Sequence, residues 1–367
     1  MEPVVLKDLT PPQLEAWLAG LGEPAYRARQ LRAWIYERGA ESFDAMTDLP
    51  AGLRARLAET AVLAAAAVVE RARSRVDGSL KVLLRLRDGE LVEAVAMPGE
   101  TRPALCLSSQ AGCPLDCAFC ETGRSGFARN LSPGEILEQV LLLQAELPPE
   151  APRPNLVFMG MGEPLLNLDA VLAALETLTH REGLGYGGRR ITVSTAGITE
   201  GIRRLAEAPV PPNLALSLNA ADPALRAALM PVAARHGADE LLAACDAYAR
   251  ATQRRVTIEY VLFAGINDRP DDAFALARVL DRRPFRVNLI PYNPGERPAR
   301  LRLPGGGEAE LARPGAAAVE RFAGRLAGRV HAVTVRWSQA VDVGGGCGQL
   351  RARRRSHGAR GGAHHRG

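Results

Sequence analysis

Three cysteines that fall within eight residues restrict the fold of this chain more than any other feature. Cys113, Cys117 and Cys120 follow the spacing Cys-x3-Cys-x2-Cys, so one tight loop carries three thiol ligands. Cysteine thiolates bind iron–sulfur clusters, and a [4Fe–4S] cluster with three protein ligands leaves one iron open to a substrate or cofactor. The spacing therefore predicts such a cluster, with the rest of the chain folded around its loop.

A structural zinc ion is the alternative to a cluster. Zinc takes four tetrahedral ligands, commonly from two pairs such as Cys-x2-Cys and His-x3-His. No second pair of this kind is present, and the six histidines are scattered over positions 180, 236, 331, 357, 364 and 365. We therefore predict one [4Fe–4S] cluster. The spacing resembles that of the radical S-adenosylmethionine (SAM) enzymes, in which the amino and carboxylate groups of SAM bind the fourth iron.

Length and composition restrict the class of protein further. The 367 residues, 47% of them hydrophobic, suffice for one large domain with an appendage. The first residues lack the basic and apolar regions of a secretory signal, and no apolar run approaches the ~18 residues that span a bilayer. We expect a cytoplasmic protein without membrane contact, whose six cysteines serve metal binding or catalysis rather than disulfides.

The charge of the chain favours an anionic partner. The formal net charge is +5 and the pI is about 9.0, as in many proteins that bind nucleic acid. The charge is weaker support for such a partner than it would usually be, because only Lys7 and Lys81 are lysines among 46 basic residues. This excess of arginine over lysine is typical of a GC-rich genome. Arginine neutralises phosphate whatever the origin of the bias, so RNA stays a candidate partner.

Residues 1–66 show helical periodicity and are predicted to form a small N-terminal appendage. Within it, residues 26–30 together with Arg32 and Arg38 form a basic stretch. This stretch either lies along RNA or is an ordinary solvated helix face, and the sequence does not separate the two interpretations.

Residues 67–100 change to a period of two, which is typical of strands. Apolar and polar residues alternate on both sides of Asp88-Gly89, a dipeptide that favours a tight turn, so this segment is predicted to contain a β-hairpin. Glu93 lies in the second strand of the hairpin. From the pattern alone, Glu93 would be an exposed carboxylate.

Residues 101–350 alternate short apolar strands with helices, which predicts a parallel α/β fold. We expect a partial (β/α)6 barrel with strands at residues 104–107, 155–159, 190–194, 213–218, 256–262, 286–290 and 331–336. The clearest helix start is the capping box that begins at Ser132. Such barrels place their chemistry in the loops after the strands, and the cysteine loop follows the first strand. Residues 351–367 hold arginine and glycine but no acid, and are predicted to be a disordered basic tail.

A glycine-lined turn, Gly-Met-Gly-Glu-Pro at residues 160–164, follows the second of these strands. Placed one strand–helix unit after the cysteine loop, it resembles the GGEP element of radical SAM enzymes, in the form found in adenine methyltransferases of the RlmN/Cfr type. The similarity covers nearly the whole chain. Specific motifs carry it at residues 106–113, 159–166, 256–260, 288–291 and 347–350.

This resemblance implies an enzyme that methylates an adenine ring carbon in structured RNA. In that family the product is 2-methyladenosine in 23S rRNA and tRNA, or 8-methyladenosine in 23S rRNA. Two SAM molecules are used per turnover, through an S-methylcysteine. We expect the C2 activity, the commoner one, on 23S rRNA and tRNA, with an electron donor such as flavodoxin or ferredoxin and a monomeric enzyme. A C8-specific enzyme and a non-catalytic iron–sulfur RNA-binding protein are the alternatives.

The resemblance also implies roles for single residues. Cys347 matches the methyl-carrying cysteine, Cys106 its resolving partner and Glu93 the proton acceptor, whereas Cys245 matches nothing catalytic and is expected in a helix core. The SAM contacts map onto Gly162, Glu163, Ser194, Ser217, Leu218, Asn219 and Asn293. Two departures stand out: Asn219 replaces a usual His, and three glycines at 344–346 replace Asp-Ala-Ala, which predicts a looser loop before Cys347.

Overall fold

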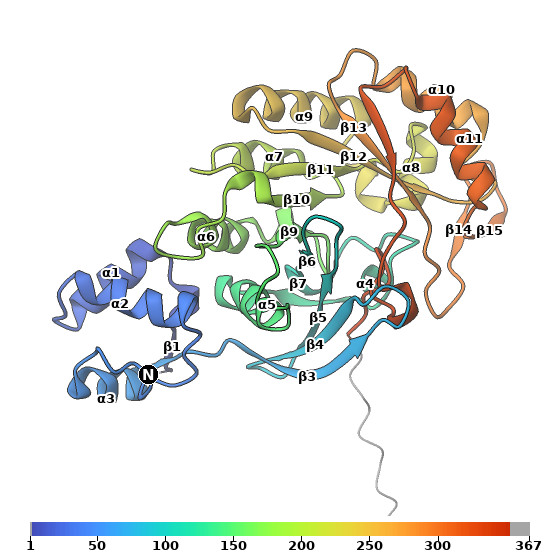
Figure 1. The fold of residues 1–367 in the computed structure, drawn as a ribbon. Helices are drawn as coiled ribbons and strands as arrows, with labels where there is room; N and C mark the ends of the chain where they lie inside the picture. Colours follow the sequence, from blue (N-terminus) through green and yellow to red (C-terminus); the bar gives the residue numbers. More distant parts are fainter. Residues whose placement is uncertain (1, 353–367) are drawn as a thin grey trace, which may run out of the picture.

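A large sheet organises the molecule (Figure 1). The computed structural model describes residues 2–352, and within that range ten strands form one sheet in the order β16-β13-β12-β11-β10-β9-β6-β5-β4-β3. The strands from β16 to β6 pair in parallel; they are β6 (Ala104–Cys106), β9 (Asn155–Phe158), β10 (Ile191–Thr195), β11 (Asn213–Ser217), β12 (Val256–Leu262), β13 (Arg286–Pro291) and β16 (Ala332–Val335). The ends of each strand lie within one residue of the predicted ends, so the α/β prediction is confirmed.

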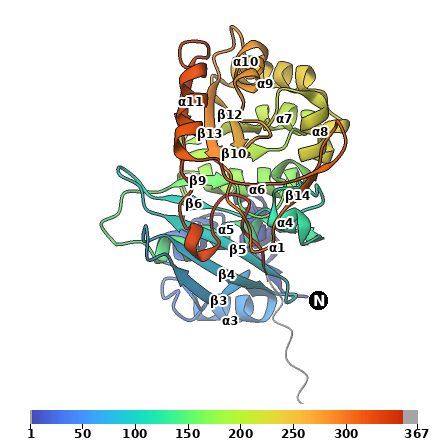
Figure 2. The same cartoon turned by 90° about the vertical axis from the view of Figure 1, so that its right-hand side faces the viewer.

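Helices join the parallel strands and lie around their outer side (Figure 2). They are α4 (Glu121–Arg124), α5 (Pro133–Ala145), α6 (Leu168–Thr179), α7 (Thr199–Ala206), α8 (Pro223–Leu229), α9 (Ala238–Thr252), α10 (Pro270–Val279) and α11 (Ala316–Leu326). The predicted capping box is present, since Ser132 Oγ accepts the Glu135 N–H at 3.2 Å and the Glu135 carboxylate accepts the Ser132 N–H at 2.9 Å. The barrel is partial because β6 pairs with β5 on its free side instead of closing onto β16.

The predicted hairpin is confirmed, and it extends the barrel sheet. Strands β3 (Ala66–Arg73), β4 (Leu80–Leu86) and β5 (Leu91–Met97) pair antiparallel, and β5 in turn pairs with β6. The turn closes where the Leu86 N–H donates to the Glu90 carbonyl at 2.8 Å, and Gly89 takes a φ of +90° that favours glycine. In this register Val95 lies opposite Cys106, which brings the hairpin beside the barrel's first strand.

The N-terminal appendage is helical, as predicted, and consists of α1 (Pro11–Gly20), α2 (Tyr26–Arg32), a π-helical turn (Ala33–Glu37) and α3 (Ala51–Thr60). Figure 1 shows α1 and α2 beside α5 and α6, with α3 farther from them. The suggestion that Arg32 lies along RNA is wrong, because Arg32 is 2% exposed and pairs with Glu15 and Glu182. Its guanidinium instead holds α1 and the loop after α6 together. Arg38 is exposed and pairs with Asp48.

Shorter elements complete the described fold. They are the parallel pair β1 (Val4–Val5) and β2 (Ala61–Val62), the hairpins β7 (Gln110–Gly112) with β8 (Phe127–Asn130) and β14 (Arg300–Arg302) with β15 (Glu308–Glu310), and short 3₁₀ turns that include Val341–Val343. The segment after β16 returns along the sheet to β4 and β5 (Figures 1 and 2). None of the described helices has the length and apolar character that crossing a bilayer requires. Most of the predicted basic tail, residues 353–367, lies outside the described residues.

Candidate active site

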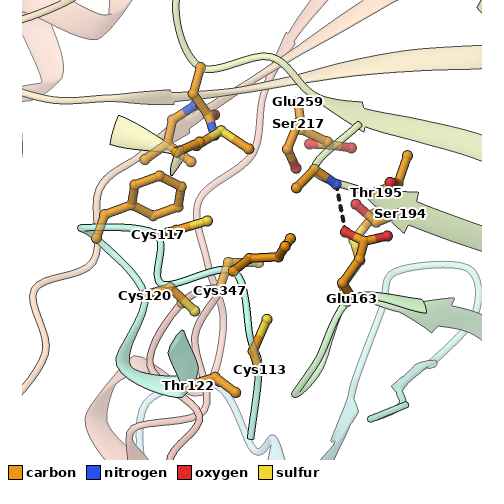
Figure 3. A pocket seen from close by; sticks show the side chains of 18 of the residues that line it. Cys113, Cys117, Cys120, Thr122, Glu163, Ser194, Thr195, Ser217, Glu259 and Cys347 are labelled. Atoms are coloured by element: carbon orange, nitrogen blue, oxygen red, sulfur yellow. Dashed lines mark hydrogen bonds between the residues drawn. The ribbon is translucent and has the colours of Figure 1, made fainter. Parts of the chain in front are cut away.

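The triple-cysteine loop lies at the end of the β7–β8 hairpin, next to β6. Gly112 has a φ of +81°, and a Cβ there would stand 2.0 Å from the Gly126 carbonyl oxygen, so only glycine allows the loop to start this way. The sulfurs of Cys113, Cys117 and Cys120 face one cavity (Figure 3). The structure thus brings the three predicted ligands to one cavity.

These three thiols fit a cluster better than a single ion. Within residues 2–352, no three His, Cys, Asp or Glu side chains converge as the ligands of one metal ion do. Ligands of a cluster stand farther apart, because each binds a different iron. Burial raises the pKa of Cys113 to about 12 and that of Cys117 well above its ordinary value. Both would be neutral thiols until metal binding removes their protons.

Glu163 faces the same cavity from the turn after β9. Glycine is required on both sides of this turn, since a Cβ on Gly160 would lie 2.7 Å from the Leu107 carbonyl oxygen and one on Gly162 would lie 2.5 Å from Gln110 Cβ. The Glu163 carboxylate accepts the N–H groups of Ala196 at 2.7 Å and Leu165 at 3.0 Å.

Burial raises the pKa of Glu163 to about 7, although these backbone donors lower it. No cationic side chain of the described residues forms an ion pair with Glu163. A buried carboxylate that lacks a protein cation is suited to a cationic ligand. The amino group of SAM is such a ligand, and the cavity already holds the three cluster thiols beside it.

The other predicted SAM contacts divide into two groups. Ser194, Ser217 and Asn293 line the cavity. Asn293 Nδ2 donates to Ser338 Oγ at 2.7 Å, whereas Asn293 Oδ1 is buried without a hydrogen-bond donor. Leu218, in contrast, is fully buried and does not line the cavity; its N–H donates to the Glu259 carbonyl. Any contact from Leu218 to a ligand would therefore have to come from its backbone.

Asn219, which stands where the resemblance leads us to expect His, has a local structural role. It lines the cavity but takes a φ of +60°, a left-handed conformation that Asn tolerates better than most residues. Its Oδ1 accepts the Val261 N–H at 2.9 Å, and its Nδ2 points at Met230 Sδ at 3.1 Å. The amide therefore fixes strand β12, and less of it is free for a ligand than the family pattern implies.

Cys347 stands between two cavities. It lines the cavity of the three cluster thiols, and it also lines a second, smaller cavity with Cys106. All six cysteines of the sequence lie within the described residues, and each is a free thiol. Cys245 is buried in α9, as predicted. The glycines before Cys347 pack closely, because a Cβ on Gly345 would lie 2.8 Å from Ala340 Cβ.

Glu93 is buried, so the pattern-based expectation of an exposed carboxylate is wrong. Its carboxylate pairs with Lys81 Nζ at 2.9 Å and accepts the Arg351 N–H at 2.6 Å. Lys81 also reaches the Gly344 carbonyl at 3.5 Å. A broad surface groove between the face of β3 and β4 and the segment 341–351 reaches down to Glu93. The sequence hid this burial because the C-terminal segment that covers Glu93 is remote in the chain.

Two polar residues escaped the sequence analysis. Glu259 on β12 lines the cluster cavity, burial raises its pKa, and its Oε2 is buried without a partner. The sequence did offer a signal for Glu259, because a glutamate in the middle of the otherwise apolar strand at 256–262 points to a functional residue. Arg336, just after β16, lines the smaller cavity with Cys106 and Cys347. No sequence signal separates it from the many other arginines.

Known proteins are similar to this chain in sequence and in fold. A family model described as the radical SAM superfamily matches residues 107–277, and one described as the ribosomal RNA large subunit methyltransferase N-terminal domain matches residues 4–63. The dual-specificity RNA methyltransferase RlmN of Anaeromyxobacter dehalogenans is 44% identical over 95% of this chain and 91% of its own length. RlmN of Syntrophobacter fumaroxidans is 43% identical over 95% and 98%. The crystal structure of a radical SAM methyltransferase from Sphaerobacter thermophilus has a TM-score of 0.88 and 42% identity, over 96% of this chain and 100% of that chain.

Proposed function

The chain belongs to the RlmN family of radical SAM RNA methyltransferases, and on this premise we propose that it methylates C2 of adenine in 23S rRNA and tRNA. The methyl group passes through an S-methylcysteine at Cys347, and two SAM molecules are used per turnover. The observation that carries the proposal is the position of Cys347, which lines both the cluster cavity and the cavity of Cys106. One thiol there can receive a methyl group on one side and be resolved by a second thiol on the other.

The cofactor sites follow from the residues of the cluster cavity. Cys113, Cys117 and Cys120 would hold one [4Fe–4S] cluster, and Glu163 with Gly162, Ser194, Ser217, Asn219 and Asn293 would hold SAM. Leu218, which does not line the cavity, would contribute through its backbone alone. When bound, the cluster and SAM supply the methyl group and the carbon radical that a poorly nucleophilic ring carbon requires. The chain contributes the positions of the groups, the exclusion of water by burial, and the proton transfers.

Glu93 is proposed to take the proton from the methylated ring carbon. It lies at the base of the groove between β3–β4 and the segment 341–351, through which an RNA base can reach it. Lys81 keeps the carboxylate in place by an ion pair of 2.9 Å, and a carboxylate is a group that can accept a proton. Arg85 and Arg351 on the walls of the groove offer charges for RNA phosphates.

We further propose a monomer in the cytoplasm that receives electrons from flavodoxin or ferredoxin. The proposal also treats residues 351–367 as a basic tail. It divides the rest of the chain into three functional segments, at residues 1–66, 67–100 and 101–350. The non-catalytic alternative does not hold, because the family is one of RNA methyltransferases. The C8-specific alternative differs from this proposal only in the product, which would be methylated at C8 of adenine instead of C2.

Mass spectrometry of adenosines from 23S rRNA and tRNA tests the proposal. Cells that carry the gene should contain 2-methyladenosine in both RNAs, and cells from which it is deleted should lack it. With SAM that carries a CD3 group, the product methyl should hold two deuterium atoms, because one is lost from S-methylated Cys347. A product that keeps all three, or that is methylated at C8, would contradict the proposed route or the proposed position.

A further inference from the structure

Arg336 is a charged side chain beside the two proposed reactive thiols, and the proposed mechanism gives it no role. It lines the small cavity with Cys106 and Cys347, and its backbone N–H continues the pairing of β16 with β13 by donating to the Leu289 carbonyl at 2.9 Å. This pairing fixes the backbone position from which the Arg336 side chain extends. The guanidinium reaches Met159 Sδ at 3.9 Å, next to Cys106.

The guanidinium of Arg336 is not neutralised by an ion pair within residues 2–352. The groups that face it electrostatically are Cys347, Glu259 and Cys106; burial lowers its pKa, these three raise it, and the net shift is upward. Glu259 is itself buried, with Oε2 unpartnered. A fixed positive charge thus lies among one carboxylate and two thiols.

Cys106 needs such a charge to react. Burial raises the pKa of its thiol to about 12, and a negative charge on Cys347 raises it further, whereas Arg336 and the Met159 backbone N–H lower it. The thiolate, not the thiol, attacks a sulfur atom. Arg336 is the cationic side chain that acts on Cys106 in this structure.

We propose that Arg336 is a positioning residue whose guanidinium stabilises the thiolate that Cys106 must form to attack Cys347 across the small cavity that all three residues line. This inference rests on the proposed function, because it concerns the step that frees the methylated base from Cys347.

The step balances as follows. The Cys106 thiolate attacks the sulfur of Cys347, which carries the base through a methylene group, and an S–S bond forms. The bond between the methylene carbon and the Cys347 sulfur breaks, and its electron pair stays on the carbon. That carbon takes one proton and becomes the methyl group. The two cysteines are oxidised to a disulfide, the carbon is reduced, and a cellular dithiol reductant later restores both thiols.

The size of the effect follows from two opposing trends. Each unit by which the pKa of Cys106 falls gives about tenfold more thiolate, but makes that thiolate roughly threefold less nucleophilic, so the net gain is about threefold per unit. A guanidinium near a buried thiolate is worth roughly two units. We therefore expect Arg336→Met to slow release of the base roughly tenfold near pH 7.5.

A single-turnover experiment with the cluster-loaded enzyme and 23S rRNA from a deletion strain tests this inference. Denaturing gels follow the covalent protein–RNA adduct, and mass spectrometry follows the product. In Arg336→Met, adduct formation should match the wild type, whereas adduct decay at pH 7.5 should be roughly tenfold slower. An increase of about one pH unit, which gives about tenfold more thiolate, should bring the variant to the rate that the wild type has at pH 7.5. Arg336→Lys, which keeps the charge, should release the base at close to the wild-type rate.

Controls separate this effect from misfolding and from a role in RNA binding. Arg329→Met removes an equal charge from the loop after α11, where the Arg329 guanidinium lies 5.3 Å from the Phe274 ring of α10, and should behave as wild type. Iron content and RNA affinity are measured for every variant, and Arg336→Gln gives a second uncharged variant if Arg336→Met fails to fold.

An unchanged rate and pH profile of adduct decay in the uncharged variants would overturn the inference. So would weaker RNA binding with normal decay, since Arg336 would then serve a phosphate. If the wild type itself formed neither adduct nor product, the proposed function would fail first, and this inference with it.

Discussion

Replacing Glu163 by Gln should stabilise the SAM-free protein at neutral pH while weakening SAM binding. Glu163 is 3% exposed, has no ion-pair partner among the described residues, and its carboxylate accepts two backbone N–H groups. Its ionised form is therefore costly until a cation binds. The amide of Gln has no charge to desolvate, but it also has no charge to offer the amino group of SAM.

The magnitude follows from the pKa of Glu163, which burial raises from 4.5 to about 7. The folded protein keeps the proton over a pH range in which the unfolded chain has lost it. Stability is therefore fully present below pH 4.5 and falls as pH rises to about 7. At about 1.4 kcal/mol per pH unit the total loss is about 3 kcal/mol, of which about 2 kcal/mol falls between pH 5.5 and 8.

Urea denaturation of the SAM-free, cluster-loaded wild type and Glu163→Gln at pH 5.5 and pH 8 measures this loss. The free energy of unfolding of the variant, relative to that of the wild type, should rise by about 2 kcal/mol between the two pH values. Any cost of the misplaced amide donor cancels, because it is the same at both. Glu200→Gln, at an exposed position on α7, is the matched control and should show no such change. An equal loss of stability in Glu163→Gln and in the wild type between pH 5.5 and pH 8 would contradict this prediction.

Three further predictions concern the reaction. Replacing any one cluster thiol by Ala should abolish the [4Fe–4S] cluster, measured as iron content and visible absorbance after anaerobic reconstitution; the three are Cys113, Cys117 and Cys120. Cys106→Ala should stall as a SAM-dependent protein–RNA adduct that survives denaturing electrophoresis, whereas Cys347→Ala should give neither adduct nor product; normal turnover by Cys106→Ala would refute the two-thiol route. Lys81→Met should lower the rate of product formation about 10- to 100-fold by removing the ion pair of Glu93, with iron content unchanged; an unaltered rate would show that Glu93 needs no cation.

The elements that were predicted well depend on short stretches of chain. The cysteine loop and the glycine turn at 160–164 are local motifs that can be recognised in a short stretch of sequence, although the glycine turn packs against Leu107 and Gln110. The strands were predicted within one residue because apolar runs between helices follow the local period of the backbone, which later folding does not change. The capping box at Ser132 forms with its own neighbours for the same reason.

Burial could not be predicted in this way, because it depends on what another part of the chain covers. Glu93 looked like an exposed strand residue until the segment around Arg351 packed over it. Arg32 looked like part of an RNA-facing stretch, yet Glu15 and Glu182 from separate elements enclose it. Each is a polar residue whose partner is distant in the sequence.

The sequence by itself determined the order of strands and helices, and it predicted the cluster ligands and the SAM turn, since each of these patterns lies within a short stretch of chain. Only the tertiary structure decided that Cys106 on β6 and Cys347 after β16 share a cavity, and that Arg336 lines it with them. The physical reason is that β6 and β16 lie on opposite sides of the parallel part of an open sheet. Only the return of the segment after β16 across β4 and β5 brings the second thiol to the first.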